Sequence, residues 1–197
     1  MKKLAILFLP LLAVSACATA DSRTNSAFQT PSNIGYLGQT LTNATRGNDI
    51  SLTGDGYAYA VGEEINGDFA GYAGIVPTTS VTAPPVLGSA TWSGTYNLAQ
   101  ITGIELSTNG LQGYAASSTG AVSLTANFAA GSLIGSSTDL DLTVNGTFVG
   151  SNLSGSVSYR GLNGALTGLV GAGGAVGAFQ GNSGTDLYAG GFMVGTP

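Results

Sequence analysis

Apolar and polar residues alternate along most of the chain beyond residue 50. The segment 56–61 places two tyrosines and a valine on one face, and the segments 122–128 and 140–148 repeat the alternation with valine, leucine and phenylalanine. A period of two is typical of half-buried β-strands. Further strands are predicted at 69–76, 89–98, 101–106, 111–116, 153–159, 165–170, 175–180 and 187–194. No stretch keeps a helical period of apolar residues, so the sequence predicts an all-β protein.

Turn signals separate these strands at intervals of roughly 8–15 residues. Asn66-Gly67 and Asn109-Gly110 are typical of hairpin turns, which need positive φ. Glycine accounts for 32 of the 197 residues, and fifteen of these lie between Gly146 and Gly195. Repeated glycine in strands indicates bends or close approaches, and a closed sheet has no exposed edge. We therefore predict a small antiparallel up-and-down β-barrel of about eight strands, preceded by a β-hairpin region and a flexible N-terminal tether.

The N-terminus has the pattern of a secretory signal peptide. Two lysines at positions 2 and 3 precede an apolar run over residues 4–14. This run is too short for a membrane-spanning helix, which needs roughly 20 residues. It ends in Val-Ser-Ala-Cys at positions 14–17, which resembles the bacterial lipobox.

Cys17 is the one cysteine of the chain. The lipobox resemblance implies cleavage after Ala16 and a diacylglyceryl group on Cys17. Two or more acyl chains hold a protein stably on a membrane, so we expect Cys17 to be the site of lipid attachment. Ala18 follows, as in enteric lipoproteins sorted to the outer membrane. An ordinary signal peptide, cleaved after Ala18 or Ala20, is the alternative.

Four regions follow from these patterns. Residues 1–16 are the predicted signal peptide, and residues 17–48, rich in Ser, Thr, Asn and Gln, are the lipidated cysteine and tether. Residues 49–86 are an N-terminal β-hairpin with a Pro/Thr connector, and residues 87–197 are the barrel. Isolated apolar residues of the tether, such as Phe28, can still dock on the domain.

Composition excludes several functions. The chain has five basic and ten acidic residues and no histidine. Without histidine there is no Ser-His-Asp or Cys-His catalytic group and no histidine-ligated zinc or haem. Basic residues are too few to bind a nucleic acid. Cleavage after residue 16 removes both lysines and changes the formal net charge from −5 to about −7. We expect a monomer without cofactor or metal.

Three polar or glycine-rich motifs are candidates for a metal, acid/base or dinucleotide site. Asp139 and Asp141 share one face of a predicted strand, where a solvent-exposed face is favoured over a metal or acid/base pair. The acidic segment 63–68 is interpreted as a polar loop rather than a weak calcium site. Gly171–Gly177 has the spacing G-x-G-x-x-x-G with no helix after it, so it predicts a hairpin turn rather than a dinucleotide site. A glycosidase pair stays open, although no two acids stand out.

Aromatic residues and one arginine complete the candidates. Tyr57, Tyr59, Trp92 and Tyr96 either line a ligand surface or fill a core, and the core is favoured because they occupy alternate strand positions. Arg160 follows a predicted strand and precedes a turn. It either binds an anion or pairs with an acid at the surface, and we favour the pair.

The last fifty residues contain four glycine and aromatic motifs. They are NGTF at 145–148, LSGSVSY at 153–159, GAFQG at 177–181 and AGGF at 189–192. These motifs resemble the end of a transferrin-binding-protein-B-like β-barrel domain. Asp186 stands where that family more often has Glu.

The resemblance covers residues 88–197, and residues 50–76 only by position. It implies an eight-stranded barrel, often with a neighbouring handle subdomain, in a lipoprotein of the Gram-negative envelope. Members of the family bind transferrin, haemoglobin or complement factor H. The mature chain has about the length of one lobe where transferrin-binding protein B has two, so no binding residue and no ligand is carried over.

The sequence therefore predicts a non-enzymatic, lipid-anchored β-barrel protein of the outer membrane or cell surface. We expect it to bind a ligand or a host or environmental partner through loops or a barrel face. One alternative is an integral eight-stranded outer-membrane barrel, for which an acylated cysteine would be redundant. A further alternative is an envelope enzyme that uses paired carboxylates.

Overall fold

A computed structural model of the chain describes residues 28–32, 35–38, 40–108 and 110–195. Cys17 and the predicted signal peptide lie outside the described residues, so the lipid anchor stays a prediction. The part that is described has no helix long and apolar enough to cross a membrane. Its strands are β1 (Thr42–Ile50), β2 (Gly56–Glu63), β3 (Phe69–Ile75), β4 (Ser89–Ser107), β5 (Gly110–Asn127), β6 (Ser132–Ser137), β7 (Leu142–Val149), β8 (Asn152–Tyr159), β9 (Leu162–Val170), β10 (Gly174–Asn182) and β11 (Leu187–Gly195).

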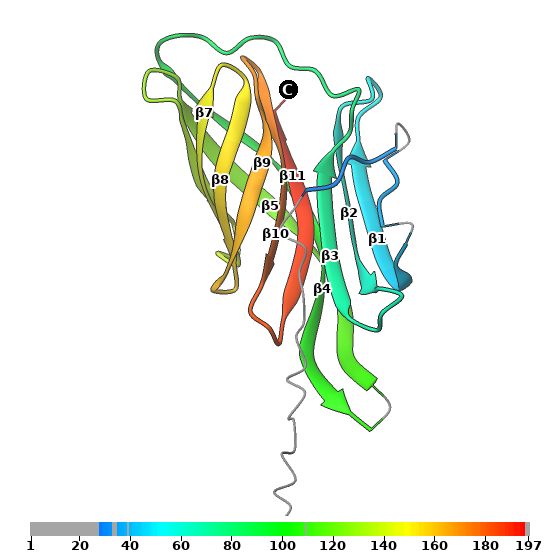
Figure 1. Cartoon of the computed structure of the whole chain (residues 1–197). Coiled ribbons are helices and arrows are strands. Elements are labelled where there is room, and N and C mark those ends of the chain that lie inside the picture. Colours follow the sequence, from blue (N-terminus) through cyan, green and yellow to red (C-terminus); the bar gives the residue numbers. More distant parts are fainter. Residues whose placement is uncertain (1–27, 33–34, 39, 109, 196–197) are drawn as a thin grey trace, which may run out of the picture.

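Strands β4 to β11 form a closed antiparallel barrel (Figure 1). Each strand pairs with the next along the chain, and β11 returns to pair with β4, with Leu187 opposite Ile101 and Val194 opposite Gly94. The predicted small up-and-down barrel of eight strands is thereby confirmed.

Apolar side chains at alternate positions fill the barrel. In β7, Leu142, Val144 and Phe148 are buried, whereas Thr143 and Thr147 are exposed. Burial of a large apolar side chain contributes about 1.5–3 kcal/mol. The barrel wall is therefore apolar inside and polar outside, which is the order the alternating sequence dictates.

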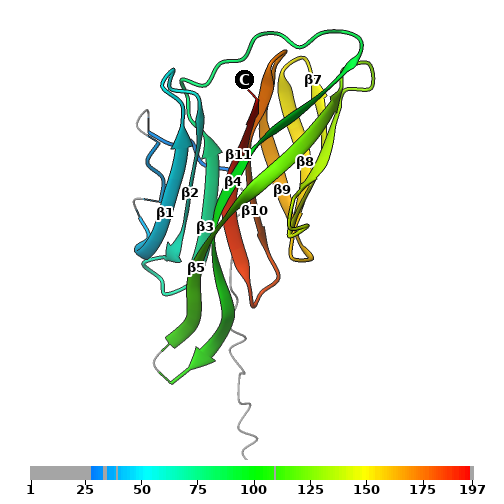
Figure 2. The same cartoon turned by 180° about the vertical axis from the view of Figure 1, so that it is seen from behind.

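Strands β1, β2 and β3 form a separate antiparallel sheet that lies against the outside of the barrel (Figures 1 and 2). A second apolar cluster joins this sheet to β4, β10 and β11. Tyr57 and Val61 come from the sheet, and Ile101, Val176 and Ala189 come from the barrel. The predicted hairpin region is thus a three-stranded sheet with its own buried face.

Tyr57 approaches the barrel closely because Gly191 has no side chain, and a Cβ at Gly191 would overlap the Tyr57 ring. The Asn97 amide donates a hydrogen bond to the Tyr57 hydroxyl at 3.0 Å, and the buried Gln180 amide oxygen accepts the Ala73 N–H at 3.0 Å. Burial raises the pKa of the Tyr57 hydroxyl. Sheet and barrel are therefore joined by apolar packing and by satisfied polar groups.

Two strands are longer than predicted. The predicted segments 89–98 and 101–106 are one continuous strand, β4, and the predicted segments 111–116 and 122–128 are one continuous strand, β5. A register shift between Thr102 and Glu105 breaks the alternation in β4. In β5, residues 112–117 are exposed on both faces, although most of them lie in the predicted strand 111–116.

Other strands were missed or misplaced. β1 lies mainly within the predicted tether. It was missed because it is a polar strand, held by pairing with β2 rather than by apolar residues of its own. β6 was not predicted. β7 begins at Leu142 rather than at 140, since Leu140 has a positive φ of 62° and belongs to a turn.

The sheet–barrel contact predicts a large difference between two tyrosines. Tyr57 is 0% exposed, whereas Tyr114 on β5 is 80% exposed. We expect Tyr57→Ala to lower the free energy of unfolding by about 3–5 kcal/mol, because it leaves a cavity in the interface. The matched control Tyr114→Ala should change it by less than about 0.5 kcal/mol. Denaturant unfolding measures both, and equal losses would contradict the described packing.

Candidate functional site

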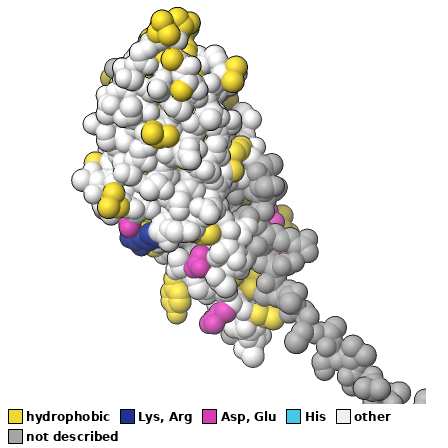
Figure 3. Space-filling model, turned by 90° about the vertical axis from the view of Figure 1, so that its left-hand side faces the viewer, with side chains coloured by type: hydrophobic (Ala, Val, Ile, Leu, Met, Phe, Trp, Pro, Cys, Tyr) yellow, Lys and Arg dark blue, Asp and Glu magenta, His cyan; other side chains and the backbone are white. Residues whose placement is uncertain are grey.

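Acidic side chains gather at one end of the molecule, the lower end in Figure 1. The turns between β6 and β7, β8 and β9, and β10 and β11 all lie there, as does the turn between β2 and β3. Seven acids belong to this end, namely Glu63, Glu64, Asp68, Glu105, Asp139, Asp141 and Asp186. Figure 3 shows charged side chains on the lower part of one face, with apolar ones and no charges above.

The paired strands β4 and β5 project beyond the barrel at this end (Figures 1 and 2). We call residues 102–107 with 110–115 the extension. Leu106 and Tyr114 of the extension are 58% and 80% exposed. An exposed tyrosine and leucine on a projecting hairpin are suited to contact another molecule, because they lose water when covered.

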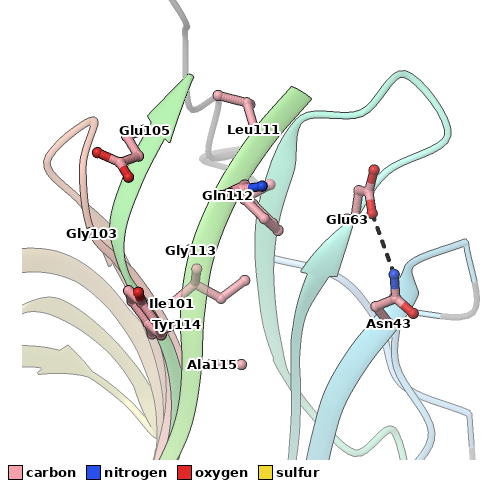
Figure 4. A pocket seen from close by; sticks show the side chains of 11 residues that line it. Asn43, Glu63, Ile101, Gly103, Glu105, Leu111, Gln112, Gly113, Tyr114 and Ala115 are labelled. Carbon is pink, nitrogen blue, oxygen red and sulfur yellow. Dashed lines mark hydrogen bonds between the residues drawn. The ribbon is translucent and has the colours of Figure 1, made fainter. Parts of the chain in front are cut away.

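A hollow of about 430 Å³ lies between the extension and the lower ends of β1, β2 and β3 (Figure 4). Ile101, Leu111 and Phe69 supply apolar lining. Glu63 stands on the opposite side from β5, where its carboxylate accepts a hydrogen bond from the Asn43 amide at 3.5 Å. The hollow, which we call the extension hollow, therefore combines an apolar lining with a carboxylate.

The mouth of the barrel holds a second hollow, of about 460 Å³. Tyr159 and Tyr188 line it from inside the barrel. The Tyr188 hydroxyl donates to the carbonyl oxygens of Val157 and Leu162 at 3.2 and 3.1 Å, and burial raises the pKa of that hydroxyl. The buried Tyr159 hydroxyl has no hydrogen-bond partner within the described residues.

Asp139 and Asp141 lie in the turn between β6 and β7 rather than on one strand face. The Asp139 carboxylate accepts hydrogen bonds from the Ser137 hydroxyl at 2.5 Å, the Asp141 N–H at 3.1 Å and the Tyr96 hydroxyl at 3.3 Å. These hydrogen bonds hold the pKa of Asp139 below its ordinary value, and the bond from Ser137 has the largest effect. The prediction that Asp139 and Asp141 share one face of a strand was therefore wrong, and Asp139 stabilises a turn.

Arg160 forms an ion pair with Asp141 at 2.8 Å and lies 5.2 Å from the centroid of the Tyr159 ring. The favoured surface pair is thereby confirmed. The bond to Asp141 raises the pKa of the guanidinium. An exposed pair of this kind contributes at most about 1 kcal/mol, so its role is local.

The acidic segment 63–68 begins with Glu63 at the end of β2 and continues as the loop 64–68 between β2 and β3. Glu64 N–H donates to the Asp68 carbonyl at 2.8 Å, and Gly67 takes a positive φ of 85°, as in a short hairpin loop. The Asn66 amide donates to Asp68 at 2.9 Å, and Glu64 accepts a hydrogen bond from the Tyr72 hydroxyl. The described part of the chain contains no group of three acids, histidines or cysteines that could hold a metal ion.

The predicted aromatic candidates are core residues. Tyr96 is buried inside the barrel, and Tyr57 and Tyr59 are buried between sheet and barrel. Trp92 is partly buried against the barrel core. Gly171–Gly177 spans the turn between β9 and β10, as predicted.

The extension hollow was missed by the sequence analysis. Its lining residues come from five strands and are far apart in the chain, so no local spacing marks them. The nearest signal was the turn pair Asn109-Gly110, of which Asn109 lies outside the described residues.

Comparisons with known proteins concern the fold. No protein-family model and no curated protein matches the sequence. A crystal structure of a surface lipoprotein is similar with a TM-score of 0.51 and 14% identity, over 76% of this chain and 80% of that one. This similarity shows the fold that the sequence motifs predicted.

Two further structures are similar at lower TM-scores. Transferrin-binding protein B of Haemophilus parasuis has a TM-score of 0.49 and 13% identity over 79% of this chain, which spans 37% of the length of that protein. The haemoglobin receptor of Kingella denitrificans has a TM-score of 0.36 and 18% identity, over 70% of this chain and 54% of that one. The surface lipoprotein with the TM-score of 0.51 therefore shows the fold, and the chain has the barrel fold of that protein.

Titration of Asp139 tests the description of the β6–β7 turn. Because the carboxylate form accepts three hydrogen bonds, its pKa should lie below the ordinary 3.8. Ser137→Ala removes the strongest donor and should raise that pKa toward the ordinary value. Carboxyl carbon NMR measures both.

The control is Thr138→Ala, because the Thr138 hydroxyl donates to the Ala121 carbonyl at 3.4 Å and not to Asp139. This variant should leave the titration of Asp139 unchanged. A midpoint at or above the ordinary value in the unaltered protein would refute the turn geometry.

Proposed function

We propose that the protein is a lipid-anchored, non-enzymatic binding protein of the outer membrane or cell surface of a Gram-negative bacterium. The observation that carries the proposal is a barrel of the surface-lipoprotein fold with a projecting hairpin and a hollow beside it. The lipobox at residues 14–17 supports anchorage through Cys17. The predicted domains are part of this proposal, with β1 added to the sheet.

Two observations support binding over catalysis. Asp139 and Asp141, the candidate acid/base pair, are engaged in a turn and an ion pair. The extension hollow is lined by the exposed Tyr114 and by Glu63, and the extension also carries the exposed Leu106. Aromatic side chains are enriched where proteins bind proteins, so the partner is proposed to be a protein.

The barrel surface favours a tethered domain over an integral barrel. A membrane-spanning barrel carries an outward apolar band, whereas three of the four outward positions of β7 are polar, namely Thr143, Asn145 and Thr147, and only Val149 at its end is apolar. In addition, the sheet β1–β3 covers one barrel face. We propose a monomer held near the membrane by its lipid.

The anchor is tested by Cys17→Ser in the full-length protein. The unaltered protein should incorporate labelled fatty acid and enter the aqueous phase only with detergent, because its acyl chains hold it on the membrane. The variant should be unlabelled and extractable without detergent. Ser15→Ala is the control, since it keeps a small residue before the cysteine.

Proteinase K treatment of intact cells tests surface display, with a periplasmic protein as the reference. Loss of the unaltered protein while the reference survives supports display on the cell surface, and survival of both would place it in the periplasm.

In the extraction test, a Cys17→Ser variant that still needs detergent would overturn anchorage and favour the integral barrel.

A further inference from the structure

One edge of β5 is open over most of its length. β5 pairs with β4 along its whole length but with β6 only from Val122 to Asn127. Among the described residues, no strand pairs with the second edge of β5 between Gly110 and Gly120. The barrel is closed, yet its longest hairpin leaves a sheet edge in solvent.

The hydrogen bonds at the ends of this edge show which backbone groups it presents. Phe128 N–H donates to the Gly88 carbonyl at 3.0 Å, so even-numbered residues of β5 face β4. Thr138 N–H donates to the Ala121 carbonyl at 3.0 Å, so odd-numbered residues face the other way. The N–H and C=O groups of five residues therefore point to the open edge, namely Leu111, Gly113, Ala115, Ser117 and Thr119.

This edge lacks the features that usually prevent strand pairing. Segment 110–121 reads GLQGYAASSTGA and contains no proline and no charged residue. Natural edge strands are commonly protected by lysine, proline or a covering loop. Nine residues from Leu111 to Thr119 extend over about 30 Å at 3.4 Å each, enough for a bound strand of ordinary length.

The extension hollow runs along the same edge. Successive residues of a strand point to opposite faces, yet all five residues from 111 to 115 line this hollow. A hollow that contacts both faces of β5 lies along its edge. Figure 4 shows these residues on one side and Glu63 with Asn43 on the other.

The charge near the edge is negative and unbalanced. Of the two arginines within the described residues, Arg46 donates to the carbonyls of Leu37, Gly38 and Leu41, and Arg160 pairs with Asp141. Neither is an ion-pair partner of Glu63 or Glu105, and Arg160–Asp141 is the one ion pair of the described residues. A positively charged group would complement the hollow.

We infer that the open edge of β5 binds an extended polypeptide segment by strand addition, with a lysine or arginine of that segment beside Glu63. The inference rests on the proposed binding function and names its partner class. Backbone hydrogen bonds to the five odd-numbered residues would supply affinity, and the apolar lining and Glu63 would select side chains. A second copy of this chain is a poorer occupant, because it would bring like acids together.

Amide hydrogen exchange gives a direct test. The probe is a ten-residue peptide of alternating threonine and valine with one central lysine, added to the processed full-length protein in detergent micelles. Without peptide, the amides of Leu111, Gly113, Ala115, Ser117 and Thr119 should exchange fast and their even-numbered neighbours slowly. With peptide, the odd-numbered amides should become at least tenfold slower. Absence of the alternating pattern, or of protection by the peptide, overturns the inference.

Two pairs of variants separate backbone pairing from charge. Ala115→Pro removes an edge N–H and leaves the ladder to β4 intact, so it should abolish peptide binding, whereas Ala115→Ser should not. Glu63→Gln should weaken binding of the lysine peptide about three- to fivefold, as expected for an exposed ion pair. Asp49→Asn, at the opposite end of β1, should leave it unchanged. Circular dichroism checks that each variant is folded.

Peptide controls complete the design. A peptide N-methylated at alternate residues cannot form the ladder and should not bind, and replacement of its lysine by glutamate should weaken binding. Equal binding of the methylated peptide would overturn strand addition. Protection of the edge that rises with protein concentration and needs no peptide would show a second copy as the occupant and overturn the inference. A surface-anchored protein without peptide binding refutes this inference and leaves the proposed function standing.

Discussion

The packing of the sheet β1–β3 on the barrel is the contact on which the rest of the structure depends. Tyr57 fills the space that Gly191 leaves free, and the apolar face of β2 meets β4, β10 and β11. β1 joins the molecule through its pairing with β2, since its own residues are largely polar and half exposed. The same contact places the lower ends of β1 and β2 beside the extension and so creates the hollow.

Charge is scarce in this molecule, and its distribution separates structural acids from free ones. Asp139 and Asp141 are used to hold turns at the barrel end. Asp55 accepts hydrogen bonds from Thr53 and Ser80, which hold its pKa below the ordinary value. Glu63 and Glu105 hold no turn in this way, although Glu63 accepts a long hydrogen bond from Asn43, and both border the hollow. In a chain with few cations, such acids are matched most easily by a partner.

Much of the barrel was predictable because inward and outward positions alternate, as Leu142, Thr143 and Val144 illustrate. The hairpin of the extension was predicted as well, from the strands 101–106 and 111–116 around Asn109-Gly110. Its projection beyond the barrel was not, because local periodicity does not show where two paired strands leave a barrel. Asp139 and Asp141 were assigned to a strand because apolar residues flank them, whereas Leu140 turns outward in a positive-φ turn. Tyr57 and Tyr96 lie in the core, as their alternate strand positions predicted, but the same alternation does not distinguish the sheet interface from the barrel interior.

By itself, the sequence determined an all-β barrel, a domain with little charge and no histidine, and a predicted lipid anchor at Cys17. These follow from composition and from local periodicity, which need no knowledge of distant contacts. Only the tertiary structure decided that β1 joins a sheet, that this sheet covers β10 and β11, and that β5 keeps one edge open. Such features depend on which strands end where in a three-dimensional sheet, because pairing between distant segments leaves no mark in local spacing.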